Sequence, residues 1–533
     1  MIVTLFAKMR NRWLQNTCIA LCAVSIRVLS AETGLLAFVR PRVKARRHLI
    51  STLWNLKGGE TSARINNTAS DSALEIVEHE LVQVQIIHRH GDRTPVTPLH
   101  NRSFWENTLP QKIVLEKLAE DIQLVRLSDQ VEGYSHGAAG GSPYGQLTTL
   151  GLLQMMELGT RLREELCHTV DGQLVENGSK KLFTPDKPLH PDRIKVRSTD
   201  FPRTIQSVQA LLVGLFPDGL HVYQQQPQTS ISLEIDVRHT RYHIPDPNPR
   251  NTPQQEFFER ELALSNHMHE REREMKPLAQ RVTHELLRQN IVLDPKIALQ
   301  VASGFKVGEA QDHSPDNVNT ESLNEGAQET TITPLPWGQL AEITKCLQVR
   351  DLLTVCSQEE QDLIMSHASW RWFETLRHPR ICLLAMTPMM TDIVNNALEI
   401  VDHYSNNNNL DQHTKPLLHI YSGHDSTLIG LMCAFQLETP STWPPYGSYL
   451  KIELLRSSNT GLNNVEPQQP NYFVRFSLNG KILRSNIYQD EDTGGPAEYV
   501  PLVVLEDFLH QAHLDTEEHL IEHLKLFTSV EKQ

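Results

Sequence analysis

Cysteine is scarce in this chain of 533 residues, and none of its seven cysteines forms a C-x-x-C pair. Cys18 and Cys22 lie near the amino terminus, and the other five have no spacing typical of a zinc site. A cysteine-based metal centre is therefore excluded. We expect the five thiols to be buried and mostly reduced, with one or two disulfides as the alternative. They are Cys167, Cys346, Cys356, Cys382 and Cys433.

Long apolar runs are also lacking. The stretch "TCIALCAVSI" ends at Arg27 after about ten residues, which is too short to cross a bilayer. No later window of about twenty residues is expected to be apolar enough to do so. The sequence therefore predicts no transmembrane segment in the mature chain.

Acidic residues are nearly absent from the first 59 positions, where ten Lys or Arg accompany the single acid Glu32. This composition is typical of a mitochondrial transit peptide, so we interpret 1–59 as a removable leader and 60–79 as a linker. A secretory signal that begins with Lys8 and continues into "TCIALCAVSI" is the alternative. Glycosylation sequons at Asn66, Asn101 and Asn177 favour that alternative, with a secreted or endomembrane-lumen location.

The rest of the chain has an acidic balance, with 40 basic and 63 acidic residues and a formal net charge of −23. Phosphate backbones repel such a surface, so nucleic acid is excluded as the expected partner. A disordered chain is excluded too, because 39% of the residues are apolar, as in globular proteins with a large core.

Against this background, three short polar clusters each follow a predicted strand. Residues 81–87 alternate apolar residues with glutamines and precede "HRHGDRTP". The strand 193–196 precedes "RSTDFPRT" and a helical run to Leu215, for which Ser198, Thr199 or Asp200 is the expected cap. The strand 417–421 precedes "SGHDST" and a helix from Asp425 or Ser426.

Strands followed by helices predict an α/β fold, in which ligands bind outside the carboxyl ends of the strands. Helix amino termini at such ends favour anions, and arginines match the oxygens of a phosphate. We therefore expect one phosphate-binding site from residues of all three clusters. Its members would be Arg89, His90, Arg93, Arg197, His424 and Asp425.

The same clusters resemble the histidine acid phosphatases. "RHGDRTP" is similar to that family's R-H-G-x-R-x-P, "RSTDFPRT" to its R-S-T-D-x-x-R-T, and "SGHDST" to its H-D segment. The likeness spans roughly 80–220 and 380–510. Within the family, "SPYGQLTTLGLLQMMELGTRLR", "STWPPYGSYLKIELL" and "LNGKIL" are closest to the branch that acts on lysophosphatidic acid.

The resemblance implies a histidine phosphatase fold and a reaction without metal or other cofactor. His90 would be the nucleophile that forms a phosphohistidine, and Asp425 would protonate the leaving oxygen. The phosphate would be bound by Arg89, Arg93, Arg197 and His424. The expected substrate is a small phosphate monoester, with lysophosphatidic acid favoured. A phytase or inositol-polyphosphate phosphatase is the first alternative, and an inactive phosphate- or lipid-binding relic is the second.

The middle of the chain departs from this likeness. We assign 80–229 and 379–533 to the α/β core, and 230–378 to an inserted helical cap with a flexible loop at 306–334. "HMHEREREMK" (267–276) in this cap contains His267 and His269. Alternating charge on a helix is typical of a solvated face, and we favour that interpretation over a metal site.

Overall fold

The computed structural model describes residues 79–120, 122–126, 142–167, 181–184, 188–220, 233–238, 253–292, 333–406, 415–457, 471–490 and 493–530. They belong to one compact unit, Ile76–Gln533. The expected leader, the linker up to residue 78, and the expected loop at 306–334 except for its last two residues lie outside the described residues.

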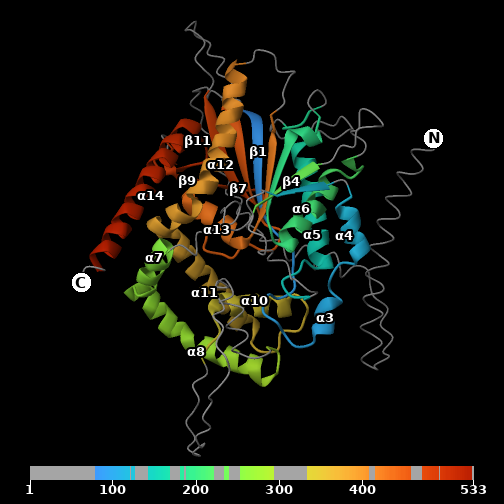
Figure 1. Ribbon diagram of the computed structural model, residues 1–533, viewed down its shortest axis with the longest axis vertical. Helices are drawn as coiled ribbons and strands as arrows, with labels where there is room; N and C mark the ends of the chain where they lie inside the picture. The colour runs from blue at the N-terminus through green and yellow to red at the C-terminus, as the bar shows by residue number, and fades with distance from the viewer. Residues whose placement is uncertain are drawn as a thin grey trace, which may run out of the picture. The chain divides into compact units, whose positions relative to one another are not determined.

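A mixed sheet forms the centre of this unit, and in the described residues it has nine strands (Figure 1). Their order is β11-β7-β6-β1-β5-β3-β4-β2, with β8 paired to β7. The strands β1, β5, β3, β4 and β2 run parallel, whereas β6 pairs antiparallel with both of its neighbours, β1 and β7. Their bounds are β1 His79–Arg89, β2 Ile122–Arg126, β3 Ile194–Thr199, β4 Leu233–Arg238, β5 Leu418–Gly423, β6 Tyr449–Ser457, β7 Tyr472–Leu478, β8 Lys481–Leu483 and β11 Val500–Pro501, with a separate pair β9 Ser485–Gln489 and β10 Pro496–Ala497.

Helices flank the sheet, which confirms the predicted α/β class. Figure 1 shows α5 (Thr149–Leu166) and α6 (Pro202–Leu215) on one side, and α12 (Pro379–Asn406) and α14 (Leu502–Val530) on the other. The short helices α3 (Arg102–Glu106) and α4 (Lys112–Leu118) follow β1, a 3-10 turn (Pro191–Arg193) precedes β3, and α13 (Asp425–Ala434) follows β5.

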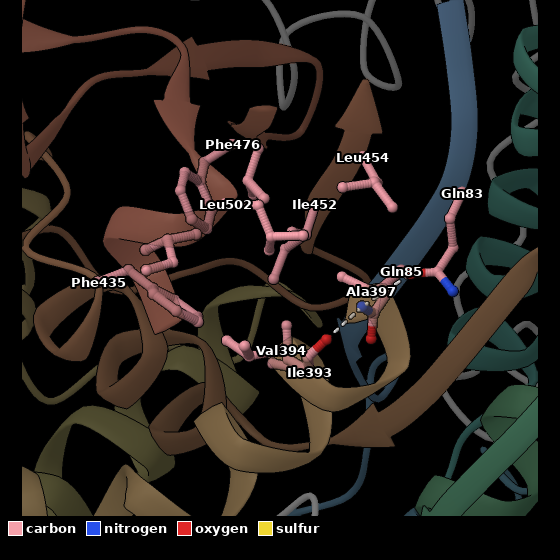
Figure 2. Close-up of a pocket in the computed structure, with 12 residues that line it drawn as sticks. Gln83, Gln85, Ile393, Val394, Ala397, Phe435, Ile452, Leu454, Phe476 and Leu502 are labelled. Carbon is pink, nitrogen blue, oxygen red and sulfur yellow. Dashed lines mark hydrogen bonds between the residues drawn. The ribbon is translucent and has the colours of Figure 1, made fainter. Parts of the chain in front are cut away.

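The central strand β1 is buried on both faces. Its valines and isoleucines join the main hydrophobic core, whereas Gln83 and Gln85 donate from Nε2 to the carbonyl oxygens of Asn396 and Ile393 in α12, at 2.9 and 2.8 Å. These hydrogen bonds satisfy amides that would otherwise be costly to bury. A cavity of about 10 Å³ lies beside the two glutamines (Figure 2). It has room for at most about one water molecule, so it is no substrate site.

Helix α12 corrects one expectation from the sequence. An 18-residue window within its stretch Pro379–Ser405 has a mean hydropathy of 1.3, and by length and composition this helix could cross a membrane. The prediction that no window after the leader is apolar enough to cross a bilayer is therefore wrong. The apolar side chains have a core role, since 61% of the window is buried in the fold and Met386, Met389 and Ile393 belong to the main core.

The predicted cap, 230–378, is mostly helical in its described residues after Arg238. It contains α7 (Pro253–Ala263), α8 (Asn266–Arg288), α10 (Trp337–Gln348) and α11 (Gln358–Arg377). A second hydrophobic cluster unites α8, α10 and α11 with Leu99 and Trp105 from the segment after β1. The expected boundary at 230 conflicts with β4, which pairs with β2 and β3 in the main sheet. We therefore propose that the cap begins after Arg238.

All five cysteines of the described unit are free thiols. Cys346 and Cys382 are buried, and the other three are partly buried. Burial raises the pKa of Cys346 to about 12, which keeps this thiol protonated and inert. The expectation of reduced thiols is met for these residues.

Candidate active site

The carboxyl ends of β1, β5 and β3 lie next to one another in the sheet. Arg89 at the end of β1 is opposite Gly423 of β5, and Ser422 of β5 is opposite Ser198 of β3. The backbone N–H of His90 donates to the carbonyl oxygen of Gly423 at 3.1 Å. The three polar segments, far apart in the sequence, therefore converge as predicted.

His90 directly follows β1 and is 3% exposed. Its Nδ1 lies 2.8 Å from the carbonyl oxygen of Gly91. Because a carbonyl oxygen only accepts, Nδ1 carries the proton and Nε2 keeps its lone pair. Burial lowers the pKa of His90 well below its usual range, and three arginines and the His424 imidazole lower it further. In decreasing order these groups are Arg203, Arg89, His424 and Arg93. The imidazole is thus neutral, which is the form a nucleophile needs.

Close packing fixes the loop that carries His90. A Cβ on Gly91 would lie 2.3 Å from the carbonyl oxygen of Gly151, in the first turn of α5. A Cβ on Gly151 would lie 2.1 Å from the carbonyl oxygen of Asp92. Only two glycines allow the loop and the helix to approach this closely. The side chain of Asp92 is buried behind the loop and accepts from Thr148 Oγ1 at 2.6 Å.

Arg89 is buried and makes contacts on several sides. Its Nη2 forms an ion pair with Asp425 Oδ2 at 2.8 Å, and its Nη1 donates to the carbonyl oxygen of Pro444 at 2.6 Å. The guanidinium carbon also lies 4.1 Å from the centroid of the Tyr446 ring. These contacts hold the charge in one place beside His90.

Asp425 is the first residue of α13, so its carboxylate lies at the positive end of the helix dipole. Its Oδ2 accepts from Trp443 Nε1 at 2.8 Å as well as from Arg89, and its Oδ1 accepts from the N–H of Ser426 at 2.9 Å. Burial acts to raise the pKa of Asp425, but the charge of Arg89 and the other groups outweigh it. The pKa is lowered to about 2, so this carboxyl is ionised at neutral pH.

His424 caps the same helix and is 7% exposed. Its Nε2 lies 3.1 Å from Thr199 Oγ1, at the end of β3. The His424 and His90 rings have centroids 5.7 Å apart. Burial lowers the pKa of His424 well below its usual range, followed in effect by the charge of Arg203. Two neutral imidazoles therefore lie side by side among the arginines.

Arg93 is bound by the cap. Its Nη1 forms an ion pair with Glu342 Oε1 of α10 at 2.8 Å. The same carboxylate accepts from the N–H of Val96 and, at 3.2 Å, from Thr97 Oγ1. One helical turn further on, the thiol of Cys346 lies 3.7 Å from the carbonyl oxygen of Arg93. After the helix ends, Arg350 Nη2 forms an ion pair with Asp92 Oδ2 at 2.8 Å. One face of α10 therefore holds the His90 loop.

Arg197 lies elsewhere, which corrects the predicted site. Its Nε is 3.0 Å from Asp236 Oδ2 in β4, and its Nη1 is 2.8 Å from Asp392 Oδ2 in α12. Tyr421 of β5 donates to the same Asp392 oxygen. Arg197 is also not among the four groups whose charges lower the pKa of His90 most. The reason is its position inside β3, where its side chain extends sideways over the sheet instead of past the strand end.

Arg203, the second arginine of "RSTDFPRT", contributes to the site instead. It is the second residue of α6, and its guanidinium carbon lies 4.2 Å from the centroid of the Phe201 ring. After burial, its charge has the largest effect on the pKa of both His90 and His424. The cap of α6 was also wrongly predicted, since the N-cap is Phe201, which makes no side-chain capping bond.

Three contributors to the site were not identified from the sequence, namely Arg203, Glu342 and Trp443. Arg203 stands in a quoted motif, and its place in the first turn of a helix after a strand was the available signal. Glu342 carries no local signal, because its contact with Arg93 joins residues 249 positions apart. Trp443 stands in "STWPPYG", directly before two prolines. This pattern indicates a packed loop, but it gives no sign that the tryptophan contacts a catalytic residue.

The histidines of the cap lie on an exposed face of α8, as predicted. His267 Nε2 is 3.6 Å from Glu374 Oε2, and both His267 and His269 are exposed. In the part of the chain that the structure describes, no group of three or more His, Cys, Asp or Glu side chains could hold a metal ion. A cleft of about 440 Å³ beside α8 and α10 is lined by Arg273, Lys276 and Trp337 among others. None of the residues that line it belongs to the candidate active site, namely Arg89, His90, Arg93, Arg203, His424 and Asp425.

A family comparison agrees with this geometry. A model of the histidine phosphatase superfamily (branch 2) matches residues 80–479, which is most of the chain. The chain belongs to this family, the histidine acid phosphatases, and is a phosphoric monoester hydrolase with the fold of that family.

Individual relatives include several named phosphatases. Counting factor 60 of Dictyostelium discoideum is 26% identical over 430 residues, covering 77% of this chain and 82% of that protein. Lysophosphatidic acid phosphatase type 6 of Bos taurus is 23% identical over 411 residues, covering 75% and 78%. Lysosomal acid phosphatase of Homo sapiens is 31% identical over 134 residues, covering 25% and 21%. Among solved structures, the phytase from Citrobacter braakii superposes with a TM-score of 0.44 at 17% identity, covering 81% of this chain and 98% of that one.

Proposed function

We propose that the chain hydrolyses phosphate monoesters through a phosphohistidine at His90. The observation that carries this proposal is the neutral His90, whose Nε2 keeps a lone pair beside positively charged arginines. An imidazole of this kind attacks phosphorus, and the positive groups offset the charge on the phosphoryl oxygens. The leaving alcohol departs, and water then releases phosphate from the phosphohistidine.

The phosphoryl oxygens are bound, in this proposal, by Arg89, Arg93, Arg203 and His424. Arg203 replaces Arg197, because Arg203 acts on both histidines whereas Arg197 is bound by two aspartates. Two carboxylates, Asp425 and Glu342, are ion-paired with Arg89 and Arg93. Arg89, Arg93 and Arg203 all lower the pKa of His90, so positive charge surrounds this imidazole, which suits an anionic substrate.

Asp425 is the proposed proton donor, although its pKa of about 2 keeps it ionised without substrate. A bound phosphoryl group adds negative charge beside the carboxylate and competes for Arg89, and both effects raise the pKa of Asp425. The proton arrives with the substrate when the ester is a monoanion, below its second pKa of roughly 6. It passes through Asp425 to the leaving oxygen, and the resulting carboxylate then takes a proton from the attacking water. Because the monoanionic ester predominates only below its second pKa, this route of proton transfer favours activity at acidic pH.

Lysophosphatidic acid is the substrate we propose. Support comes from the likeness of "STWPPYGSYLKIELL" to that branch and from a relative of that name that aligns over three quarters of this chain. A panel of lysophosphatidic acid, phytate, glycerol phosphate and p-nitrophenyl phosphate tests it through kcat/KM. The highest value is expected for lysophosphatidic acid. Preference for phytate would favour the first alternative, and no turnover of any ester would favour a binding relic.

For location, we propose the secretory route, with a lumenal or secreted protein. A relative is named lysosomal acid phosphatase, and the sequon residue Asn101 is exposed at the amino terminus of α3. Mitochondrial import, which the composition of 1–59 predicts, is the alternative outcome. A reporter fused to 1–59, together with a glycosidase-sensitive mass shift of the whole protein that is lost in Asn101→Gln, separates the two routes.

A further inference from the structure

The segment 440–447 between α13 and β6 makes four contacts with Arg89, Asp425 and His90. The carbonyl oxygen of Pro444 accepts from Arg89, the Tyr446 ring lies beside the same guanidinium, and the indole Nε1 of Trp443 donates to Asp425 Oδ2. In addition, the N–H of Gly447 donates to the carbonyl oxygen of His90 at 3.1 Å. This segment, called the 440–447 loop, therefore contacts the proposed nucleophile, an arginine and the proposed proton donor.

Every oxygen of Asp425 accepts a hydrogen bond from a donor. Oδ2 accepts from Arg89 Nη2 and Trp443 Nε1, both at 2.8 Å, and Oδ1 accepts from the N–H of Ser426. An indole N–H is a donor only, so it cannot share an oxygen lone pair with an incoming proton. Protonation of Oδ2 therefore requires the Arg89 bond or the Trp443 bond to lengthen or break, and a bound phosphoryl group competes only for Arg89.

The cap contacts Trp443 from the opposite direction. The ring of Trp372 in α11 meets the Trp443 ring edge to face, with centroids 6.5 Å apart and an interplanar angle of 83°. Trp372 is partly buried and packs against the main core, so α11 holds it in place. A shift of α11 therefore changes the position of the indole relative to Asp425.

We propose that Trp443 is a positioning residue that orients the Asp425 carboxyl for proton transfer, and that α11 of the cap holds Trp443 through Trp372. The proposal rests on the role of Asp425 given above. Other groups that act on Asp425 are Arg89 of β1, His424 of α13 and Arg93 of the His90 loop. Trp443 differs from the two arginines because it is neutral, and from His424 because its indole N–H does not titrate, so its effect depends on the direction of one hydrogen bond.

The test compares Trp443→Phe with the parent enzyme, since phenylalanine keeps an aromatic ring but lacks the N–H. For alkyl phosphates such as glycerol phosphate we expect kcat to fall by roughly tenfold, the loss of one hydrogen bond to a charged group. The alkaline limb of the kcat–pH profile should move up by about one pH unit, because the proton shared by the bound ester and Asp425 is held more tightly when the carboxylate lacks this donor. For p-nitrophenyl phosphate, whose phenolate leaves without a proton, the loss in phosphorylation rate should be much smaller.

A double-mutant cycle identifies the residue through which Trp443 acts. In the Asp425→Asn background, Trp443→Phe should reduce the rate of alkyl phosphate hydrolysis no further. Additive losses in the double variant, or equal losses for both leaving groups with an unmoved pH limb, would overturn the proposal. Binding of vanadate should be retained in Trp443→Phe, which separates this failure from failure of the phosphate site and so of the proposed function.

Two further variants test the contribution of the cap. Trp372→Leu keeps the Trp443 N–H but removes the ring that packs against Trp443. We expect the alkaline limb of the kcat–pH profile to shift in the same direction as in Trp443→Phe, by a smaller amount. Trp370→Leu, the same substitution at a tryptophan of α11 outside this contact, should leave the alkaline limb of the kcat–pH profile unchanged. If Trp443→Phe fails to fold, Trp372→Leu carries the test, and an unmoved limb in that variant would contradict the role of α11.

Discussion

Arg197 and Arg203 stand six residues apart in "RSTDFPRT", yet they lie in opposite environments. Arg197 lies within β3 and is bound by Asp236 and Asp392, so its charge is neutralised inside the protein. Arg203 lies in the first turn of α6 and acts on the two neutral histidines. One sequence motif can therefore contain two arginines with different structural roles. One stabilises the sheet, and the other acts on the two histidines of the candidate active site.

The largest effect should come from Arg203→Ala. Removing this guanidinium removes up to two charge-assisted hydrogen bonds to the phosphoryl group, worth about 1.5 to 3 kcal/mol each. We expect kcat/KM for p-nitrophenyl phosphate to fall between about 10²- and 10⁴-fold, with weaker inhibition by vanadate and a nearly unchanged thermal midpoint. Arg203→Lys should recover part of the loss through its charge. Unchanged vanadate inhibition in Arg203→Ala would place this residue outside the site.

Arg197→Ala should reverse this pattern. It leaves Asp392 and Asp236 without their shared partner, and breaking such a pair costs about 3 to 5 kcal/mol of folding stability. The urea midpoint should fall accordingly, while the folded fraction keeps its affinity for vanadate. Arg238, which also pairs with Asp236 but is more exposed, provides the control. Arg238→Ala should cost about 1 kcal/mol or less. A stable Arg197→Ala protein that no longer binds vanadate would contradict the comparison.

Acid should destabilise the sheet through its buried histidines. Burial lowers the pKa of His88 to about 4 and that of His419 to about 3. The unfolded chain, with an ordinary histidine pKa near 6.5, binds these protons first, so stability is greatest above that pH and is lost as pH falls toward the folded values. At pH 4.5 each histidine should cost about 2 to 3 kcal/mol. His419→Gln should flatten the stability profile between roughly pH 6.5 and 4.5, and an unchanged slope in urea titrations would refute this.

The smallest effect is expected at Glu342. Its carboxylate is paired with Arg93, so an amide in its place leaves more positive charge for a bound anion. Glu342→Gln should tighten inhibition by inorganic phosphate several-fold, about 1 kcal/mol for one charge at a partly screened distance. Weaker inhibition would mean that Glu342 acts mainly by orienting Arg93.

The sequence allowed the fold class and most of the cluster to be predicted, because these depend on short patterns. Strands that end in polar residues placed Arg89, His90, Arg93, His424 and Asp425 together, and the structure brings them together. Two other features depend on information that local patterns lack. The direction of the Arg197 side chain is set by Asp392 in α12, almost two hundred residues later. The contact of Glu342 with Arg93 depends on how the cap packs on the His90 loop.

The boundary of the cap was misplaced for a similar reason. The strand β4 (Leu233–Arg238) follows a segment rich in glutamine and proline, and its short "LEIDVR" alternates apolar and charged residues. Only its pairing with β2 and β3 shows that it belongs to the main sheet. The apolar composition of α12 likewise reflects burial in the core on several sides of the helix. The sequence alone does not distinguish such a core helix from a membrane-spanning helix.

Trapping of the phosphoenzyme tests the central claim most directly. The enzyme is mixed with p-nitrophenyl phosphate, quenched within milliseconds in alkali, which preserves phosphohistidine, and digested for mass spectrometry. We predict one phosphoryl group on the peptide that contains His90, a burst of p-nitrophenol of matching size, and loss of both in His90→Ala. Turnover of p-nitrophenyl phosphate by a folded His90→Ala protein, or a phosphoryl group on any other residue, would contradict the account.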